Sequence, residues 1–221
     1  MLFYEFFADD FDSVVNMYDT RKRISVVFDE LLAKEKLKNK KLLDAGCGTG
    51  WFSAVATKRG AQVTSMDIGK NLLKQVAKKC HSKRIVGSIL KMPFKANTFD
   101  YVISSEVVEH VSNPDKALRE LYRVLKPGGI LVLTTPNRFW YFALIIGNFF
   151  KLRPYQGLEN WYRYGELRNK LKKIGFNIKK MYGIHTFPFV FPILNPVLDR
   201  LHFLRKLLAP IMLNIAVKCQ K

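Results

Sequence analysis

The chain has 221 residues, of which 48% are hydrophobic and 25% are charged; these are the proportions of a folded globular protein and exclude a mostly disordered one. Its formal net charge is +19, and residues 137–221 contribute most of it, with 15 basic and three acidic residues. A surface this basic either attracts polyanions, such as nucleic acid or anionic lipid, or serves only to keep the protein soluble.

Apolar residues alternate along the chain between helical spacing and short continuous runs. Helical spacing predicts a helix over 20–36, and the apolar run at 42–46 predicts a buried strand that enters a glycine turn. We then expect strands at 61–66, 83–87, 99–104 and 130–135, helices at 51–59, 70–80, 113–125 and 163–173, and further strands at 177–182 and 214–219. Because strands alternate with helices, the sequence predicts an α/β fold with a mainly parallel sheet covered on both faces.

Cysteine usage and the first residues of the chain indicate a cytoplasmic protein. Cys47, Cys80 and Cys219 are widely spaced and predict neither a disulfide framework nor a metal site, so a reduced compartment is expected. The N-terminal stretch is acidic where a signal peptide would be basic. Apolar runs stay shorter than the roughly 18 residues of a transmembrane helix, so none is expected.

The segment LLDAGCGTG at 42–50 is the most informative part of the chain. A buried strand ends at Asp44, glycines follow at Gly46, Gly48 and Gly50, and a helix then begins. Glycines let the backbone turn sharply and approach a ligand. Asp67, 19 positions after Gly48, closes the second strand, where an acidic residue suits a ribose diol. The alternative is an ordinary strand–helix turn in which Asp67 caps the next helix.

Four segments in chain order resemble the class I methyltransferases that use S-adenosylmethionine (SAM). DAGCGTG at 44–50 resembles motif I, and the others are GSILKMPF at 87–94, FDYVISSEVVEHV at 99–111 and LRELYRVLKPGGILVLTTPN at 118–137. In motif the chain is similar to the methyltransferases of ubiquinone and menaquinone biosynthesis. The resemblance implies a Rossmann-like, seven-stranded sheet in a single domain over 1–221. It further implies a helical cap at 1–38, an apolar helical insert after the fifth strand, and substrate or lid additions at 138–160 and 186–212.

The resemblance also implies which residues bind SAM. The glycines would line its methionine part above Asp44, Asp67 would hold the ribose, and Ile68, Ile89 and Leu90 would cover the adenine. Ser88 stands where the family often has an acid, and its hydroxyl can still accept a hydrogen bond. Arg21 or Arg23 would reach the SAM carboxylate, although TRKR is also an ordinary solvated helix start. The predicted SAM contacts are Asp44, Gly46, Cys47, Gly48, Gly50, Asp67, Ile68, Ser88, Ile89, Leu90, Ser105 and Arg23.

EVVEH at 106–110 follows the fourth strand, where open α/β sheets bind ligands. If it turns helically, Glu106, Glu109 and His110 share one face. His110 would then be a general base beside Glu106, or the three residues would bind Mg²⁺ that acidifies a hydroxyl, as the resemblance to the ubiquinone enzymes implies. The third alternative is that His110 is structural or lines the substrate.

Two apolar regions point to the acceptor side. FWYFALIIGNFF at 139–150 carries no charge and is flanked by basic residues, and a second apolar region spans 187–213. These regions are either a lid packed on the sheet or a contact with an anionic membrane at its inner face. The second alternative suits a small or lipid-like acceptor, such as a polyprenylated ring, a quinone or a lipid-linked sugar.

Three functions follow from these patterns. The motifs and apolar regions favour an O-methyltransferase, and the net charge of +19 favours an RNA methyltransferase. Nucleic acid is the weaker expectation, because SSEV at 104–107 is not the N-P-P-[YF]-like motif of enzymes that methylate amines or bases. A SAM-binding protein without catalytic activity is the third alternative.

Overall fold

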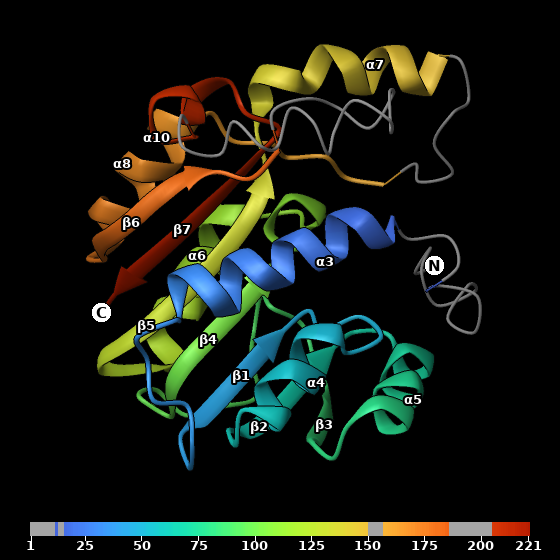
Figure 1. Cartoon of the computed structure of the whole chain (residues 1–221), viewed down its shortest axis with the longest axis vertical. Helices are drawn as coiled ribbons and strands as arrows, with labels where there is room; N and C mark the ends of the chain where they lie inside the picture. Colours follow the sequence, from blue (N-terminus) through green and yellow to red (C-terminus); the bar gives the residue numbers. More distant parts are fainter. Residues whose placement is uncertain (1–11, 13–15, 150–156, 186–204) are drawn as a thin grey trace.

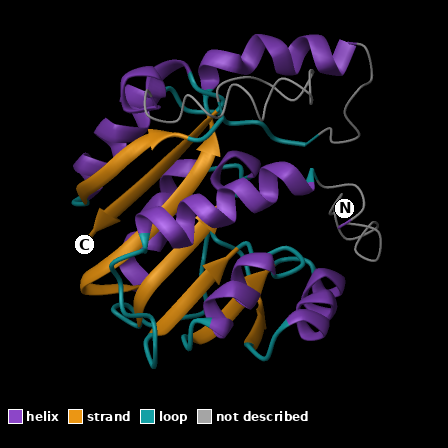
Figure 2. Cartoon of the chain, in the orientation of Figure 1, coloured by secondary structure: helices purple, strands orange, loops and turns teal. Residues whose placement is uncertain are grey.

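The computed structural model describes residue 12 and residues 16–149, 157–185 and 205–221. They form a seven-stranded sheet in the order β3-β2-β1-β4-β5-β7-β6 with helices on both sides (Figures 1 and 2). The strands are β1 (Lys41–Ala45), β2 (Gln62–Asp67), β3 (Lys83–Val86), β4 (Phe99–Ser105), β5 (Leu125–Pro136), β6 (Asn177–Gly183) and β7 (Asn214–Gln220). The helical elements are α3 (Met17–Ser25), η1 (Val26–Leu31), α4 (Trp51–Lys58), α5 (Lys70–Lys79), η2 (Val108–His110), α6 (Pro114–Val124), η3 (Arg138–Trp140), α7 (Tyr141–Phe149), α8 (Tyr164–Ile174), α10 (Arg205–Leu208) and η5 (Ala209–Ile211).

The predicted Rossmann-like fold is confirmed. Strands β1 to β5 pair in parallel, and β7 runs antiparallel between β5 and β6. The chain moves outward from β1 through β2 to β3 and then returns to place β4 on the other side of β1. Such a switch in strand order opens a crevice at the carboxyl ends of the strands, where ligands bind in open α/β sheets.

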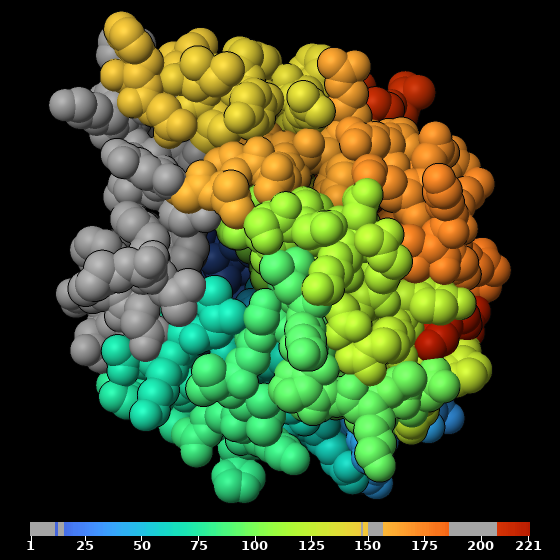
Figure 3. Space-filling view, turned by 180° about the vertical axis from the view of Figure 1, so that it is seen from behind, coloured from blue at the N-terminus to red at the C-terminus, as the bar shows by residue number. Residues whose placement is uncertain are grey.

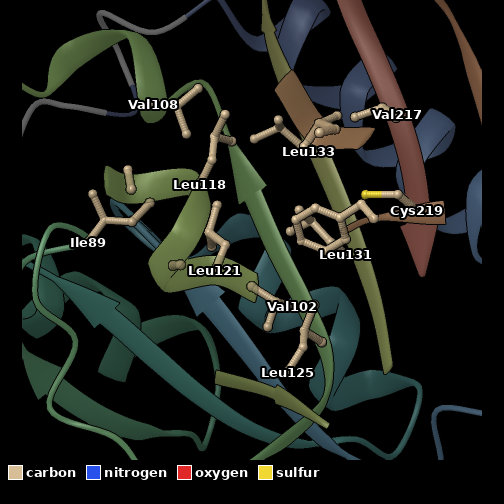
Figure 4. Close-up of a cluster of buried hydrophobic side chains, with 14 of the residues drawn as sticks. Ile89, Val102, Val108, Leu118, Leu121, Leu125, Leu131, Leu133, Val217 and Cys219 are labelled. Carbon is tan, nitrogen blue, oxygen red and sulfur yellow. The ribbon is translucent and has the colours of Figure 1, made fainter. Parts of the chain in front are cut away.

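Side chains alternate between the two faces of the sheet, as the period of a strand requires. Val102 and Leu131 lie in the larger core (Figure 4), which also contains Leu43 and buried residues of α6 and α8. Their neighbours Leu42 and Ile103 point the other way, toward the buried residues of η1 and α4. Two apolar layers therefore hold the helices on both faces, and the loops at the ends of the strands remain available for a site.

Two element boundaries differ from the prediction. The first helix begins at Met17 and ends at Leu31 as a π-helical turn, shorter at its end than the expected 20–36. The chain leaves it so that Glu35 accepts hydrogen bonds from Tyr101 and Lys218. The strand expected at 130–135 is longer in the structure, because β5 already begins at Leu125. The sheet absorbs the Pro-Gly-Gly stretch as a shift of register against β4.

Several predicted segments lie partly outside the described residues. These are the cap at 1–38 and the additions at 138–160 and 186–212, of which residues 1–11, 13–15, 150–156 and 186–204 are not described. Within the part of the chain that the structure describes, no helix is long and apolar enough to cross a bilayer. Cys47, Cys80 and Cys219 are free thiols.

Candidate functional site

The glycine loop lies between β1 and α4 at the switch in strand order. Gly46, Gly48 and Gly50 have φ angles of 77°, 51° and 90°, the left-handed region that glycine tolerates best. The N–H groups of Gly46 and Cys47 donate to the carbonyl oxygen of Met66 at 2.8 and 3.0 Å. A Cβ on Gly46 would lie 2.5 Å from a methyl of Val107. The loop therefore requires glycine at this position for its turn and for its packing.

Asp67 joins the glycine loop to the start of α5. Its two carboxylate oxygens accept hydrogen bonds of 2.9 Å from the N–H groups of Gly48 and Gly69. The N-cap position of α5 is Gly69, and the hydrogen bond from its N–H means that Asp67 also supports the start of this helix. Each carboxylate oxygen can accept more than one hydrogen bond, and the next residue, Ile68, is 48% exposed. An acceptor for hydroxyls beside an exposed apolar side chain suits a nucleoside.

Asp44 lies beneath the loop and inside the protein. It is 2% exposed, and Ser53 donates a 2.6 Å hydrogen bond to it. Ser53 is in turn 2.7 Å from Ser65 between their hydroxyl oxygens. Burial raises the pKa of Asp44 to about 7, and the charge of Asp67 adds to the effect. Asp44 is thus a structural support of the loop that can carry a proton near neutral pH.

The remaining residues predicted on the adenine side differ in exposure. Ser88 accepts a 3.2 Å hydrogen bond from the N–H of Leu90, so its hydroxyl already holds its own loop. Ile89 is 4% exposed and belongs to the larger core, whereas Leu90 is half-buried. Cys47 is buried, which raises its thiol pKa well above the ordinary value. It is therefore a protonated thiol.

Arg23 on α3 is buried at the edge of the site, whereas Arg21 is exposed. The Arg23 guanidinium donates to Asp19 at 2.8 Å and to the hydroxyl of Ser105, at the end of β4, at 2.9 Å. Asp19 also lies 3.0 Å from Nε2 of the buried His185. Burial alone would lower the pKa of Arg23, but the charges of Asp19 and Glu106 outweigh it and raise that pKa. Arg23 is therefore a fixed cation.

Glu106 and Glu109 place two buried carboxyl groups just beyond β4. Asn214 donates a 2.9 Å hydrogen bond to Oε2 of Glu106, and Thr135 donates one of 3.2 Å to Oε2 of Glu109. The other oxygen of each, Oε1, is buried and has no hydrogen-bond partner among the described residues. Burial raises the pKa of Glu106 to about 7, and it raises the pKa of Glu109 well above its ordinary value. Such groups are those that a bound hydrogen-bond donor would satisfy.

The shared helical face predicted for Glu106, Glu109 and His110 is wrong. Glu106 has a left-handed φ of 55°, and only Val108–His110 form a short 3-10 turn. His110 points toward the 158–160 loop, where its Nδ1 lies 3.0 Å from the carbonyl oxygen of Leu158. Within the described residues no three His, Cys, Asp or Glu side chains are arranged to hold a metal ion. These three residues therefore do not fit the predicted Mg²⁺ site.

Sequence reasoning missed the residues that come from distant parts of the chain. Asn214, Asp19 and His185 reach the site only through the folding of β7, α3 and the end of β6. Asp12 is another: it accepts hydrogen bonds from Thr49 and Trp51, at 2.6 and 3.0 Å, beside the glycine loop. No spacing in the sequence signals these contacts. Neither of two surface cavities, of about 480 and 510 Å³, is lined by the loop, so the loop and Asp67 locate the site.

The family comparison agrees with this geometry. A family model described as a methyltransferase domain matches residues 43–133. The chain is 41% identical over 96 residues to malonyl-[acyl-carrier protein] O-methyltransferase of Serratia marcescens, in an alignment covering 42% of this chain and 37% of that protein. It is 30% identical over 166 residues to ubiquinone biosynthesis O-methyltransferase of Nitrosococcus oceani, covering 69% and 70% respectively. The chain thus spans little more than a third of the first relative and about two thirds of the second.

Solved structures give the same fold. The crystal structure of a SAM-dependent methyltransferase from Thermotoga maritima superposes with a TM-score of 0.69, and the match covers 99% of this chain and 98% of that one. The sequences are 17% identical, so this likeness concerns the fold alone.

Proposed function

The chain belongs to the class I SAM-dependent methyltransferases, and from that premise we propose that it transfers the methyl group of SAM to a hydroxyl oxygen of a small or lipid-like acceptor. The observation that carries the proposal is Asp67, because its carboxylate is fixed by the N–H groups of Gly48 and Gly69 and stands beside the exposed Ile68. In this proposal Asp67 binds the ribose hydroxyls, and Ile68 lies against the adenine.

Bound SAM would supply an electrophilic methyl group on a positively charged sulfur. The residues beyond β4 suit the other end of such a molecule, since the buried Oε1 of Glu106 lacks a partner among the described residues. An amino group of the cofactor or the hydroxyl of the acceptor would satisfy it. Arg23 and Ser105 lie beside it and would fix the position of a carboxylate or of the acceptor.

His110 is the proposed general base. A carbonyl oxygen can only accept, so Nδ1 donates to Leu158, and in the neutral ring Nε2 carries the lone pair. Nε2 lies 3.9 Å from Oε1 of Glu109. In this proposal Nε2 of His110 takes a proton from the acceptor hydroxyl, beside a Glu109 carboxyl group whose pKa burial raises well above its ordinary value. Removal of this proton is what an oxygen acceptor needs, and both curated relatives described above are named O-methyltransferases.

Helix α7 supports a lipid-like acceptor at an anionic membrane. Phe142, Ile145, Ile146 and Phe149 follow one another at helical spacing and are 51%, 58%, 52% and 80% exposed. A stripe of this kind is costly in water and suits the boundary of headgroups and acyl chains. The excess of basic residues in 137–221 would add attraction to anionic lipid. The helix would therefore hold the site against the surface in which the acceptor resides.

The first test is calorimetric titration of SAM into the purified chain. We expect saturable binding that Asp67→Ala abolishes and that Asp29→Ala, a change of an exposed acid bonded to Arg59, leaves unchanged. No binding to correctly folded wild-type protein would refute the proposal.

The second test follows radioactive methyl groups from SAM. The chain is incubated with membranes of its host, and the products are separated into a lipid extract and an RNA fraction. Label in the lipid extract supports the proposal. Label in RNA would contradict it and identify RNA as the acceptor, a polyanion that the net charge of +19 would attract. Binding of SAM without any transfer would favour the non-catalytic alternative.

A further inference from the structure

A surface cavity of about 480 Å³ lies on the α6 and α8 side of the site. We call it the α6–α8 cavity; its walls come from the start of α6, the start of α7, the loop at 159–162 and α8. Figure 3 shows this face, on which α7 (gold) lies above the orange segment of the loop and α8, and the yellow-green start of α6 lies below. The cavity is therefore bounded by the start of α7 on one side and by α6 and α8, which cover the sheet, on the other.

Aromatic rings form part of the wall. Tyr141, the first residue of α7, packs edge-to-face on Trp161 with ring centroids 5.7 Å apart. The indole N–H of Trp161 donates to Glu159 at 2.5 Å, which fixes the orientation of the ring. Tyr162 is held in the same way, since its hydroxyl donates to Asp115 at 3.1 Å. Tyr162 is buried and supports the wall from behind, whereas the partly exposed ring of Trp161 offers a preformed apolar face to a ligand.

Polar groups form the rest of the wall, and its acidic residues outnumber its basic ones, which disfavours an anionic ligand. Asp115, Glu159 and Glu166 stand against Arg138 and Lys170. Lys170 is already paired with both oxygens of Asp115 at 2.7 Å. Planar carboxylates, amides and a guanidinium can each bind two neighbouring hydroxyl groups, because they present paired acceptors or donors. Together with aromatic faces, such a wall suits a neutral molecule that carries many hydroxyls.

The cavity is joined to the proposed base by backbone contacts. Asn160, on its rim, donates from its backbone N–H to the carbonyl oxygen of Glu109 and from its side chain to the carbonyl oxygen of Val111, both at 2.8 Å. The same loop holds His110 through Leu158. A ligand in the cavity would therefore contact the loop that positions His110. Tyr141, on the cavity wall, is the first residue of α7, the helix that carries the exposed apolar stripe.

We infer that the α6–α8 cavity binds the sugar headgroup of the acceptor, an amphiphile whose apolar tail remains in the membrane that α7 contacts. This deepens the proposed function and rests on it for the role of the ligand as acceptor. Sugar recognition at the cavity itself requires only the walls described above.

The test is saturation-transfer NMR with octyl glucoside and octyl galactoside, each kept monomeric below its micelle concentration. For at least one of them we expect saturation of the sugar-ring protons by the wild-type chain. Glu166→Ala, an exposed side chain on the wall, should weaken this binding roughly tenfold, as loss of a hydrogen bond to a charged group predicts. Trp161→Ala should abolish the ring-proton signal. The matched control is Lys172→Ala, because Lys172 is exposed on α8, the helix that also carries Glu166.

Saturation of alkyl protons alone, or ring-proton saturation equal in the wild type and both wall variants, would overturn the inference. Because Trp161 is partly buried, circular dichroism of each variant separates misfolding from loss of binding, and Glu166→Ala carries the test if Trp161→Ala misfolds. Calorimetric titration of SAM into the same wild-type sample keeps the two proposals apart. If the wild-type chain binds the sugar and does not bind SAM, the proposed methyl transfer is refuted and sugar binding at the cavity stands.

Discussion

Asn214, the first residue of β7, donates a 2.9 Å hydrogen bond from Nδ2 to Oε2 of Glu106, which lies 108 positions earlier in the chain. The antiparallel strand β7 brings Asn214 opposite Pro136, at the carboxyl end of β5. Glu106 reaches this point because its left-handed backbone turns the chain away from β4 while its N–H donates to the carbonyl of Thr134 at 3.0 Å. The strand that comes last in the sequence, β7, thus supports an acidic side chain of the candidate site.

We predict that Asn214→Leu lowers the free energy of unfolding by about 1–3 kcal/mol, because the buried Glu106 loses a hydrogen-bond donor. Urea unfolding measures the change. The same substitution in a Glu106→Leu background is the control, since no carboxylate is then left unsatisfied. If Asn214→Leu costs the same in both backgrounds, the hydrogen bond is not the cause.

The pH dependence of stability should reflect the two acids whose pKa burial raises. The pKa values of Glu106 and Asp44 rise to about 7 from ordinary values of 4.5 and 3.8. Between these values the folded chain binds more protons than the unfolded chain, so stability is greatest below the ordinary pKa and falls as pH rises toward about 7. Glu106→Gln, which does not titrate, should lose less stability than the wild type between about pH 5 and 8. Parallel pH profiles in urea unfolding would contradict the assignment.

Gly46→Ala should destabilise the chain through two separable effects. A Cβ in the left-handed region costs about 1–2 kcal/mol, and the approach of 2.5 Å to Val107 adds an overpacking cost. Val107→Ala in the same chain should recover the second cost and not the first. Thermal unfolding of the single and double variants measures this. Full recovery in the double variant would mean that the backbone angle of Gly46 carries no strain for alanine.

The sequence could predict the features that depend on local pattern. The strands and helices around the glycine loop follow from the alternation of period, and the Gly48–Asp67 pair follows from its spacing of 19 positions. The strand β5 begins early because Leu125 already pairs with Phe99 of β4, and the stretch with Pro127 and Gly128 forms an irregularity in the register before pairing resumes at Ile130. Propensity is a weak guide where tertiary pairing decides the element.

The part of the site that could not be predicted depends on long-range contacts. His185 meets Asp19 across 166 positions, and no periodicity connects two such residues. The prediction that EVVEH at 106–110 shares one helical face was wrong for a different reason. Glu106 adopts a left-handed backbone that propensity disfavours, and it does so where the chain leaves β4 at the candidate site.

His110→Gln should lower the turnover of methyl transfer by about 10²–10⁴-fold, the usual contribution of a general base. The binding of SAM should stay unchanged, because the proposed role of His110 concerns the acceptor alone. Transfer of label from SAM and calorimetry measure the two quantities. His81→Gln, an exposed histidine before β3, is the matched control. Equal turnover in His110→Gln and wild type would remove His110 from the chemistry.

The exposed stripe of α7 gives the last prediction. Replacing Ile145 and Ile146 with aspartate should abolish co-sedimentation with phosphatidylglycerol vesicles, because it places two anions in the apolar face that would enter the lipid boundary. Stability should change by less than about 0.5 kcal/mol per site, since both side chains are more than half exposed. Val86→Asp is the matched control, because Val86 is 58% exposed on β3, the edge strand remote from α7. Vesicle binding that survives the α7 changes, or that is lost equally in Val86→Asp, would show that the basic surface binds the vesicles without this helix.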